Sequence, residues 1–307
     1  MVISIHDCDF NEFTFGHDVL RAFDYYRIGG FAPIIPHLRD EGKGTTQSRM
    51  HTITPLSHQP LKVPDGVFNA SRVIAGASQP PPNQSLPLSG SDAVIQLSAW
   101  FRPIFLQFKI PTWVDGKNRK VLEYVRVPLP WHDFYRMPLR CKGNPSQHSI
   151  MCNMQNRGHF SLYVTPNFHE KEKREEFYNS RTTVENCSFI RPLSIGQLYD
   201  GKSHHISYTG SSTTFWRFSE PVEIENGIFS IDSIEKDIAN QPYYEFTPAK
   251  VNGIANSLSS LAREWGDDTE ILHRTDTITD AIKNLSLVSS LKFNCQLLLG
   301  VTTQETV

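Results

Sequence analysis

The sequence predicts a mixed α/β (α+β) fold with a central sheet flanked by helices and a helical C-terminal region. Two β-prone runs, at residues 104–110 and 160–165, predict buried strands. Apolar residues spaced three or four apart predict amphipathic helices toward both ends of the chain, at residues 13–27 and 278–291. The 307 residues suffice for one large domain or two ordinary ones, with a core that needs no disulfides.

Composition and charge indicate an ordinary globular protein. The net charge of −2 gives no overall attraction to a polyanion, so any contact with nucleic acid requires a local basic patch. No segment approaches the roughly 20 apolar residues of a membrane helix, and residues 1–10 lack the apolar region of a signal peptide. The five cysteines are scattered and form no CxxC pair, which favours reduced thiols. We therefore expect a cytoplasmic protein without a membrane partner.

The N-terminal half combines a helix, a polar stretch and two strands. After the helix at residues 13–27, residues 42–91 are rich in Ser, Thr, Gln, Gly and Pro and show no periodicity. This composition predicts a loop-rich insertion outside the core. Strands are expected at residues 92–99 and 104–110, and Pro103 is expected to separate them.

The same patterns predict the elements of the second half. Charged residues dominate one expected helix, whereas the last two carry apolar stripes. The expected elements are a helix at 146–156, a strand at 160–165, a charged helix at 169–179, β segments at 205–208 and 215–224, a helix at 251–265, and a helix from 278 to near residue 300. The last two helices are expected to form a layer or a surface for a protein partner or a second copy.

A polar group on the predicted central strands is the best candidate for chemistry. Gln107 and Lys109 are two residues apart, so on a strand both side chains point to the same face, while Phe108 points into the core. Asp92 opens the preceding strand and can lie beside them. A carboxylate and an amide oxygen are ligands that suit Mg²⁺.

These residues resemble the core of the PD-(D/E)xK nuclease superfamily, and most closely its Mrr-like branch, in which the second acidic position is often Gln (QxK). In that family an Asp opens the second core strand and the (D/E/Q)-x-K triplet lies on the third. The resemblance implies a restriction-endonuclease-like core that covers about residues 13–168. We therefore expect a nuclease-like domain at residues 1–168, with the insertion inside it, and a β-containing extension with the C-terminal helices at residues 169–307.

The resemblance also implies an activity, namely Mg²⁺-dependent cleavage of a phosphodiester bond in nucleic acid, with DNA as the expected substrate and bacterial antiviral defence as the context. Asp92 and Gln107 would bind the metal. Because Gln is a weaker ligand than Glu, a third ligand that is a carboxylate is needed, and Glu41 is the candidate. Lys109 would orient the attacking water and offset the charge that develops on the phosphate.

Gln147 and His148 begin the helix that follows the QxK strand. In a nuclease they would lie beside the site and contact phosphate or the metal shell. The alternative is that they are simply the polar residues of a helix N-terminus. His204 and His205 could suggest a metal, but adjacent residues on a strand point to opposite faces and cannot easily share an ion. A surface turn followed by a strand is the favoured interpretation.

Three interpretations remain open from the sequence. The first is an active nuclease. The second is a non-catalytic nucleic-acid-binding or scaffold subunit with a nuclease-like fold, in agreement with the near-neutral charge and the Gln in place of an acid. The third is an unrelated α+β protein, in which Asp92 is a turn residue and Lys109 extends to solvent from the end of a strand. No Walker, GxGxxG, GxSxG or HExxH motif is present, which argues against several other enzyme classes.

Overall fold

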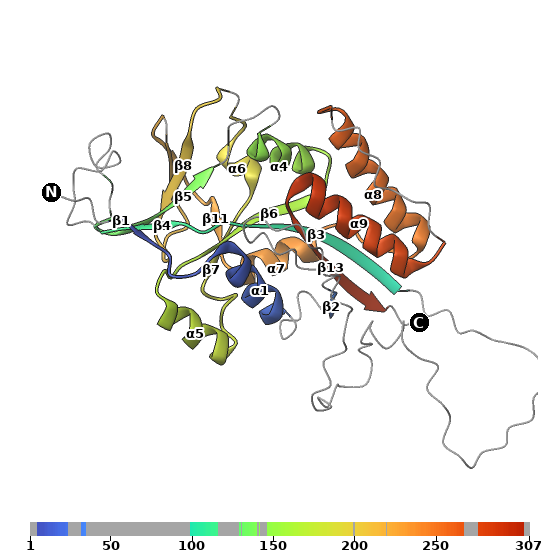
Figure 1. The fold of residues 1–307 in the computed structure, drawn as a ribbon, viewed down its shortest axis with the longest axis horizontal. Coiled ribbons are helices and arrows are strands. Elements are labelled where there is room, and N and C mark those ends of the chain that lie inside the picture. The colour runs from blue at the N-terminus through green and yellow to red at the C-terminus, as the bar shows by residue number, and fades with distance from the viewer. Residues whose placement is uncertain are drawn as a thin grey trace, which may run out of the picture.

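The structure is a computed structural model, and it describes residues 5–23, 32–34, 99–115, 129, 131–139, 141, 146–198, 200–218, 220–266 and 276–303. Within these residues the chain forms seven helices and two sheets, one of them mixed (Figure 1). The expected mixed α/β fold class is confirmed. The predicted insertion at 42–91 lies outside the described residues, as does nearly all of the predicted strand at 92–99.

The larger sheet contains seven strands and forms the centre of the molecule. Its order is β11-β7-β6-β3-β13-β2, with β12 also paired to β3. The strands are β2 (Ala32–Ile34), β3 (Ala99–Phe108), β6 (Phe160–Pro166), β7 (Cys187–Ile190), β11 (Ile228–Phe229), β12 (Tyr244–Glu245) and β13 (Gln296–Thr303). Strands β3 and β6 are parallel, whereas the other pairs are antiparallel.

The second sheet is antiparallel throughout and has the order β1-β4-β5-β8-β9-β10. Its strands are β1 (Ile5–Asp7), β4 (Thr112–Val114), β5 (Phe134–Leu139), β8 (His204–Tyr208), β9 (Phe215–Phe218) and β10 (Val222–Ile224). Strand β4 follows β3 directly in the chain, so the end of β3 lies where the two sheets meet.

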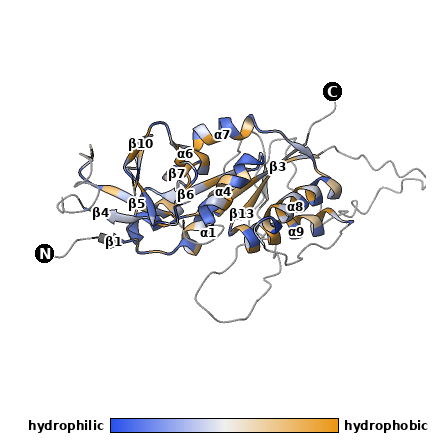
Figure 2. Cartoon of the chain, turned by 90° about the horizontal axis from the view of Figure 1, so that it is seen from above, coloured by the Kyte–Doolittle hydropathy of each residue, from blue (hydrophilic) through white to orange (hydrophobic). Residues whose placement is uncertain are grey.

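The helices cover both faces of the larger sheet. They are α1 (Glu12–Phe23), α4 (Gln147–Asn156), α5 (Lys171–Ser180), α6 (Pro192–Ile195), α7 (Ile231–Ala239), α8 (Pro248–Arg263) and α9 (Ile278–Phe293). Helices α4, α8 and α9 share one apolar cluster, whereas α1 and α7 share the other. Figure 2 shows polar and apolar residues alternating around α8 and α9, as expected for helices that bury one side. The body of the protein therefore covers most of their stripes.

Strand β3 is the centre of the fold because both of its faces are buried. Phe105 belongs to the cluster on the α4 side, whereas Leu106 and Phe108 belong to the cluster on the α1 side. This alternation follows from the two-residue period of a strand. A strand that is buried on both faces is apolar almost throughout, which explains why its sequence is so clearly β-prone.

Two sequence expectations at this sheet are wrong. Pro103 does not precede the strand but lies within β3. On one side of β3, β12 pairs with residues 100–101 and β6 with residues 104–108, so Pro103 lies in the gap between them, where a missing N–H costs less. The segment at 296–299, expected at the end of the last helix, is strand β13, because it pairs with β3 along the middle of the sheet. The two predicted parts of the chain, 1–168 and 169–307, therefore share one sheet.

The connection from β3 to β6 positions the candidate site. Strands β3 and β6 are parallel neighbours, and α4 lies in the connection between them. Their carboxyl ends therefore lie at the same edge of the sheet, and α4 begins at that edge. Such an edge commonly holds ligands in α/β proteins, since helix N-terminal N–H groups also point there. In the described part of the chain, no helix is long and apolar enough to cross a membrane.

Candidate functional site

Gln107 and Lys109 lie at the end of β3, on the face toward α4. Both side chains are buried, with 1 % and 5 % of their surface exposed. Phe108, between them, packs against Phe15 of α1 on the opposite face. The strand phase expected from the sequence is therefore the one that the structure has.

Among the described residues, the Gln107 amide has a hydrogen-bond partner for its nitrogen but none for its oxygen. Nε2 donates to the backbone oxygen of Asn294 at 3.3 Å. Asn294 caps α9 in the left-handed conformation, with φ of 51°, which is a common way for a helix to end. The Gln107 Oε1 atom is buried and accepts no hydrogen bond from the described residues. A buried acceptor without a partner costs about 1–3 kcal/mol, so a ligand that this oxygen binds would recover that energy.

Lys109 is positioned by α4 and β6. Its Nζ donates to Gln147 Oε1 at 2.8 Å, in the first turn of α4. The same Nζ lies 5.8 Å from the centre of the Tyr163 ring, within the range of cation–π attraction. Tyr163 is also the residue of β6 that pairs with Gln107 in the ladder. One aromatic ring thus flanks both candidate residues of the QxK triplet.

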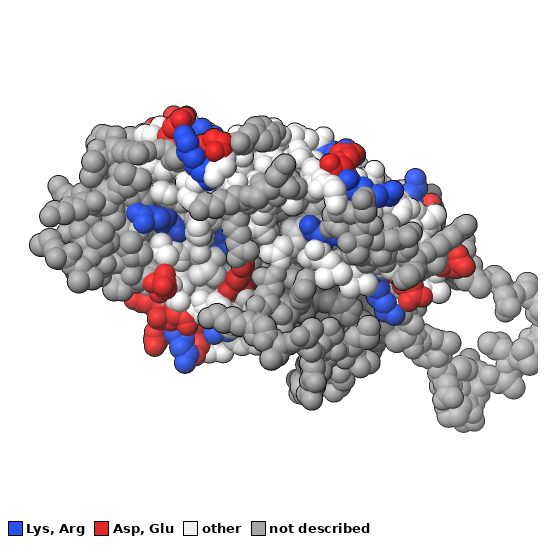
Figure 3. Space-filling view, turned by 45° about the horizontal axis from the view of Figure 1, so that its top comes forward, with Lys and Arg blue, Asp and Glu red and all other residues white. Residues whose placement is uncertain are grey.

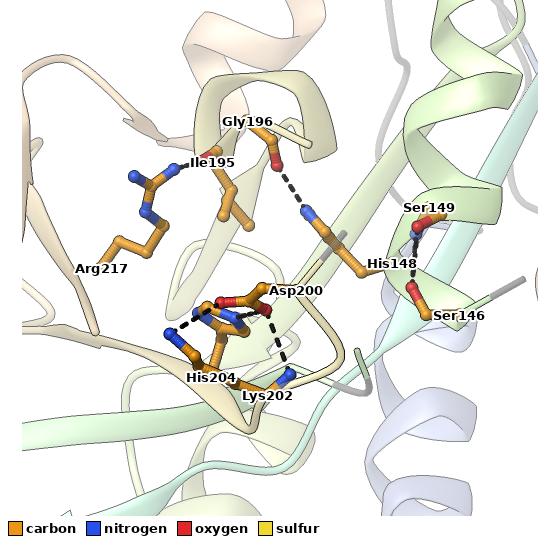
Figure 4. A network of polar contacts seen from close by, with 9 residues as sticks. All are labelled: Ser146, His148, Ser149, Ile195, Gly196, Asp200, Lys202, His204 and Arg217. Atoms are coloured by element: carbon orange, nitrogen blue, oxygen red, sulfur yellow. Dashed lines mark hydrogen bonds and ion pairs between the residues drawn. The ribbon is translucent and has the colours of Figure 1, made fainter. Parts of the chain in front are cut away.

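His148 is almost fully buried, and Figure 4 shows its ring directed toward the Gly196 oxygen. Its Nε2 lies 2.7 Å from the Gly196 oxygen, and its Nδ1 lies 3.0 Å from the Tyr163 hydroxyl. A carbonyl only accepts, so Nε2 carries the hydrogen and Nδ1 accepts from Tyr163. Burial lowers the pKa of His148 to about 4. Three neighbouring basic groups act in the same direction: His204, Lys109 and Arg217. His148 is therefore neutral at pH 7, and described protein groups engage both ring nitrogens.

A second polar layer holds the turn after α6 (Figure 4). Arg217 of β9 donates to the Ile195 oxygen at 2.7 Å, next to the Gly196 oxygen that His148 binds. Asp200 lies 2.6 Å from the buried ring of His204, and this hydrogen bond holds the pKa of Asp200 below its usual range. His204 and His205 face opposite sides of β8, since His204 contacts Asp200 and His205 stacks on Phe218.

The helix that carries Gln147 and His148 starts where the sequence predicts. The Ser146 hydroxyl caps α4 by accepting from the Ser149 N–H at 3.1 Å, as serine does at many helix starts. Gly158, with φ of 81°, follows its C-terminal end. A short, well-capped helix fixes the direction in which its first side chains point.

Two predicted site residues and one further polar group complete the candidates for metal binding. Asp92 and Glu41 lie outside the described residues. One other group in the described ranges has metal-ligand chemistry. It consists of Asp115, His132 and Asp133, where β4 ends and β5 begins, with ligand atoms within 4.8 Å of one another. One of these three residues is exposed and the other two are half-buried, so this group is a weaker candidate than the buried Gln107 oxygen.

The chain matches no protein-family model, no curated protein and no solved structure. The candidate site therefore depends on its geometry alone.

The residues that surround the QxK pair were not predicted from the sequence. Tyr163 was inside a predicted strand, but the register that places it beside Gln107 is not visible in the sequence. Asn294 could have been predicted as the end of a helix, because Asn is frequent in the left-handed conformation that ends many helices. His204 was dismissed as part of a surface turn and strand. The turn before it is exposed, but its own ring is buried.

Proposed function

We propose that this protein is a Mg²⁺-dependent nuclease that cleaves phosphodiester bonds in nucleic acid. The observation that carries the proposal is the buried Oε1 of Gln107, which accepts no hydrogen bond from the described residues and lies on the same strand face as the buried Lys109. An oxygen that lacks a hydrogen-bond donor is suited to a hard cation. A lysine on the same face is suited to the negative charge of a phosphate.

Gln107 would supply an amide oxygen, a ligand type that suits magnesium, and the resemblance to the nuclease family would add the Asp92 carboxylate. Because β6 and β13 are the neighbours of β3 near Gln107, that carboxylate would have to reach the metal from outside the sheet. When bound, the metal would polarise the scissile phosphate and increase the acidity of the attacking water. Lys109 would orient that water and offset charge on the phosphate. Gln147 holds the Lys109 ammonium at 2.8 Å and so limits the positions that it samples.

The mixed surface charge does not favour a substrate that binds along a broad basic surface. A substrate would have to be recognised mainly at a local site. On the face shown in Figure 3, lysine and arginine side chains lie in small groups mixed with aspartate and glutamate. Binding to DNA along such a face would be weak, since the phosphates contribute most of the non-specific affinity. A non-catalytic subunit with the same fold is the second candidate, and the Gln at an acidic position favours it.

We expect Lys109→Met to lower Mg²⁺-dependent cleavage of double-stranded DNA by at least about 100-fold, because loss of one group that stabilises developing charge typically has that effect. The substitution removes the charge and keeps an unbranched side chain that is only one atom shorter. The measurement is single-turnover cleavage of a labelled duplex in Mg²⁺ and in EDTA. The matched control is Lys173→Met, which removes an exposed lysine of α5 that pairs with Glu176. Full activity in Lys109→Met, or equal loss in the control, would contradict the proposal.

Gln107→Glu tests the metal independently of cleavage. The new carboxylate would face the Asn294 oxygen, which now accepts from the amide nitrogen. We therefore expect a loss of roughly 1–3 kcal/mol in the free energy of unfolding in EDTA, as for an uncompensated buried polar group. Mg²⁺ at millimolar concentration should restore much of it, and the shift in the thermal midpoint measures this. If Mg²⁺ shifts wild type and variant equally, Gln107 is not a metal ligand.

A further inference from the structure

The first turn of α4 is linked to Lys109 directly through one residue and indirectly through the next. Gln147 accepts directly from the Lys109 ammonium at 2.8 Å. The next residue, His148, does not reach Lys109. It binds the hydroxyl of Tyr163, whose ring lies 5.8 Å from the same ammonium. Two adjacent residues of one helical turn thus act on a single lysine.

Two features hold the Tyr163 side chain in place: burial of its ring and the hydrogen bond of its hydroxyl to His148. The ring is 1 % exposed and belongs to the apolar cluster on the α4 side. Burial raises the pKa of the hydroxyl well above its usual value, so the group remains a donor. The hydroxyl is the only polar atom of this side chain, and His148 Nδ1 accepts its hydrogen bond.

His148 is in turn fixed at its other nitrogen. The Nε2 hydrogen bond goes to Gly196, whose φ of 86° suits glycine. A Cβ at Gly196 would lie 3.1 Å from Nη1 of Arg217. Arg217 itself donates to the adjacent carbonyl of Ile195. The turn after α6 is thereby held by two donors on consecutive carbonyls, and it fixes both the tautomer and the direction of the His148 ring.

We propose that His148 is a positioning residue that fixes the Lys109 ammonium through the Tyr163 ring. The inference rests on the proposed nuclease function for its kinetic consequence, but the contact itself is a property of the fold. His148 would not touch the substrate. This differs from the sequence expectation that it contacts phosphate or the metal shell, because both of its nitrogens already bind described protein groups.

The test compares His148→Gln, Tyr163→Phe and the double variant. His148→Gln retains a donor for Gly196 but loses the acceptor for Tyr163, whereas Tyr163→Phe retains the ring and loses only the hydroxyl. We expect each single variant to lower kcat for duplex cleavage in Mg²⁺ about tenfold, because small displacements of a reacting group slow the chemical step. KM should be unchanged, and the double variant should be no slower than either single one, since all three break the same contact.

A second buried histidine provides the control. His159 lies at the other end of α4, has a pKa lowered by burial, and contacts Ser257 at 3.3 Å. His159→Gln should affect stability but leave kcat unchanged. If His159→Gln lowers kcat as much as His148→Gln, the effect is general destabilisation and the proposal fails. It also fails if His148→Gln keeps the wild-type kcat, or if the effects of the two single variants add.

An NMR measurement separates this inference from the proposed function. The methylene signals next to the Lys109 ammonium, assigned by their loss in Lys109→Met, report the ring current of Tyr163. We expect His148→Gln and Tyr163→Phe to shift these signals and His159→Gln to leave them in place. If the wild type does not cleave nucleic acid in Mg²⁺, the proposed function fails, and these shifts alone decide the positioning contact. Unmoved Lys109 signals in both single variants would overturn it.

Discussion

Phe108→Ala is expected to lower the free energy of unfolding by about 3–5 kcal/mol, the usual cost of truncating a buried phenylalanine. The Phe108 ring is 6 % exposed and packs edge-to-face on Phe15, with ring centres 5.8 Å apart. Helix α1 approaches it so closely that a Cβ at Gly16 would lie 2.7 Å from its Cδ2 atom. Truncation therefore leaves a cavity between α1 and β3 that neither rigid element can easily close. Equilibrium unfolding in urea measures the loss.

The matched control for Phe108→Ala is a substitution of Phe13, which lies on α1, the helix that packs against Phe108. The Phe13 side chain is 37 % exposed, so Phe13→Ala should cost much less. Because Phe108 and Lys109 are adjacent on β3, Phe108→Ala and Lys109→Met also test the strand phase. The first should act mainly on stability, and the second mainly on activity. A harmless Phe108→Ala would show that residues 99–108 are not a strand buried on both faces, and the candidate site would lose its framework.

The free energy of unfolding is expected to fall steeply as the pH decreases from about 6.5 toward 4, and His148 should account for a large part of this loss. The pKa of His148 is about 4 in the folded protein, below the ordinary histidine value of 6.5. The unfolded chain therefore takes up the proton first, and acid favours unfolding. The contribution of His148 is absent above pH 6.5. It reaches about 2 kcal/mol by pH 5 and on the order of 3 kcal/mol below pH 4, at 1.36 kcal/mol per pKa unit.

The test for this pH dependence compares the slopes of wild type and His148→Gln. Between pH 7.5 and 5 the wild type should lose about 2 kcal/mol more than the variant, whatever the stability of the variant at pH 7.5. The basic groups that face His148 are His204, Lys109 and Arg217, and all three remain in the variant. Parallel curves for the two proteins would show that His148 is not held neutral in the fold.

The order of elements and the phase of the QxK strand follow from local sequence. A two-residue period places Gln107 and Lys109 on one face and Phe108 on the other, whatever the neighbouring strands are. Ser146 marks the start of α4 through its own hydroxyl, and Gly158 marks its end through its backbone freedom. These features need only the residues themselves and their nearest neighbours in the chain.

Only the tertiary structure decided what surrounds that pair. The apolar run at 297–299 suits a helix or a strand equally well by its pattern, and pairing with β3 made it a strand. That pairing brings the Asn294 oxygen to the Gln107 amide. The register of β6 places Tyr163 beside Gln107. These contacts join residues that are distant in the chain, and their energies come from pairing and burial, which depend on neighbours that a local pattern does not contain.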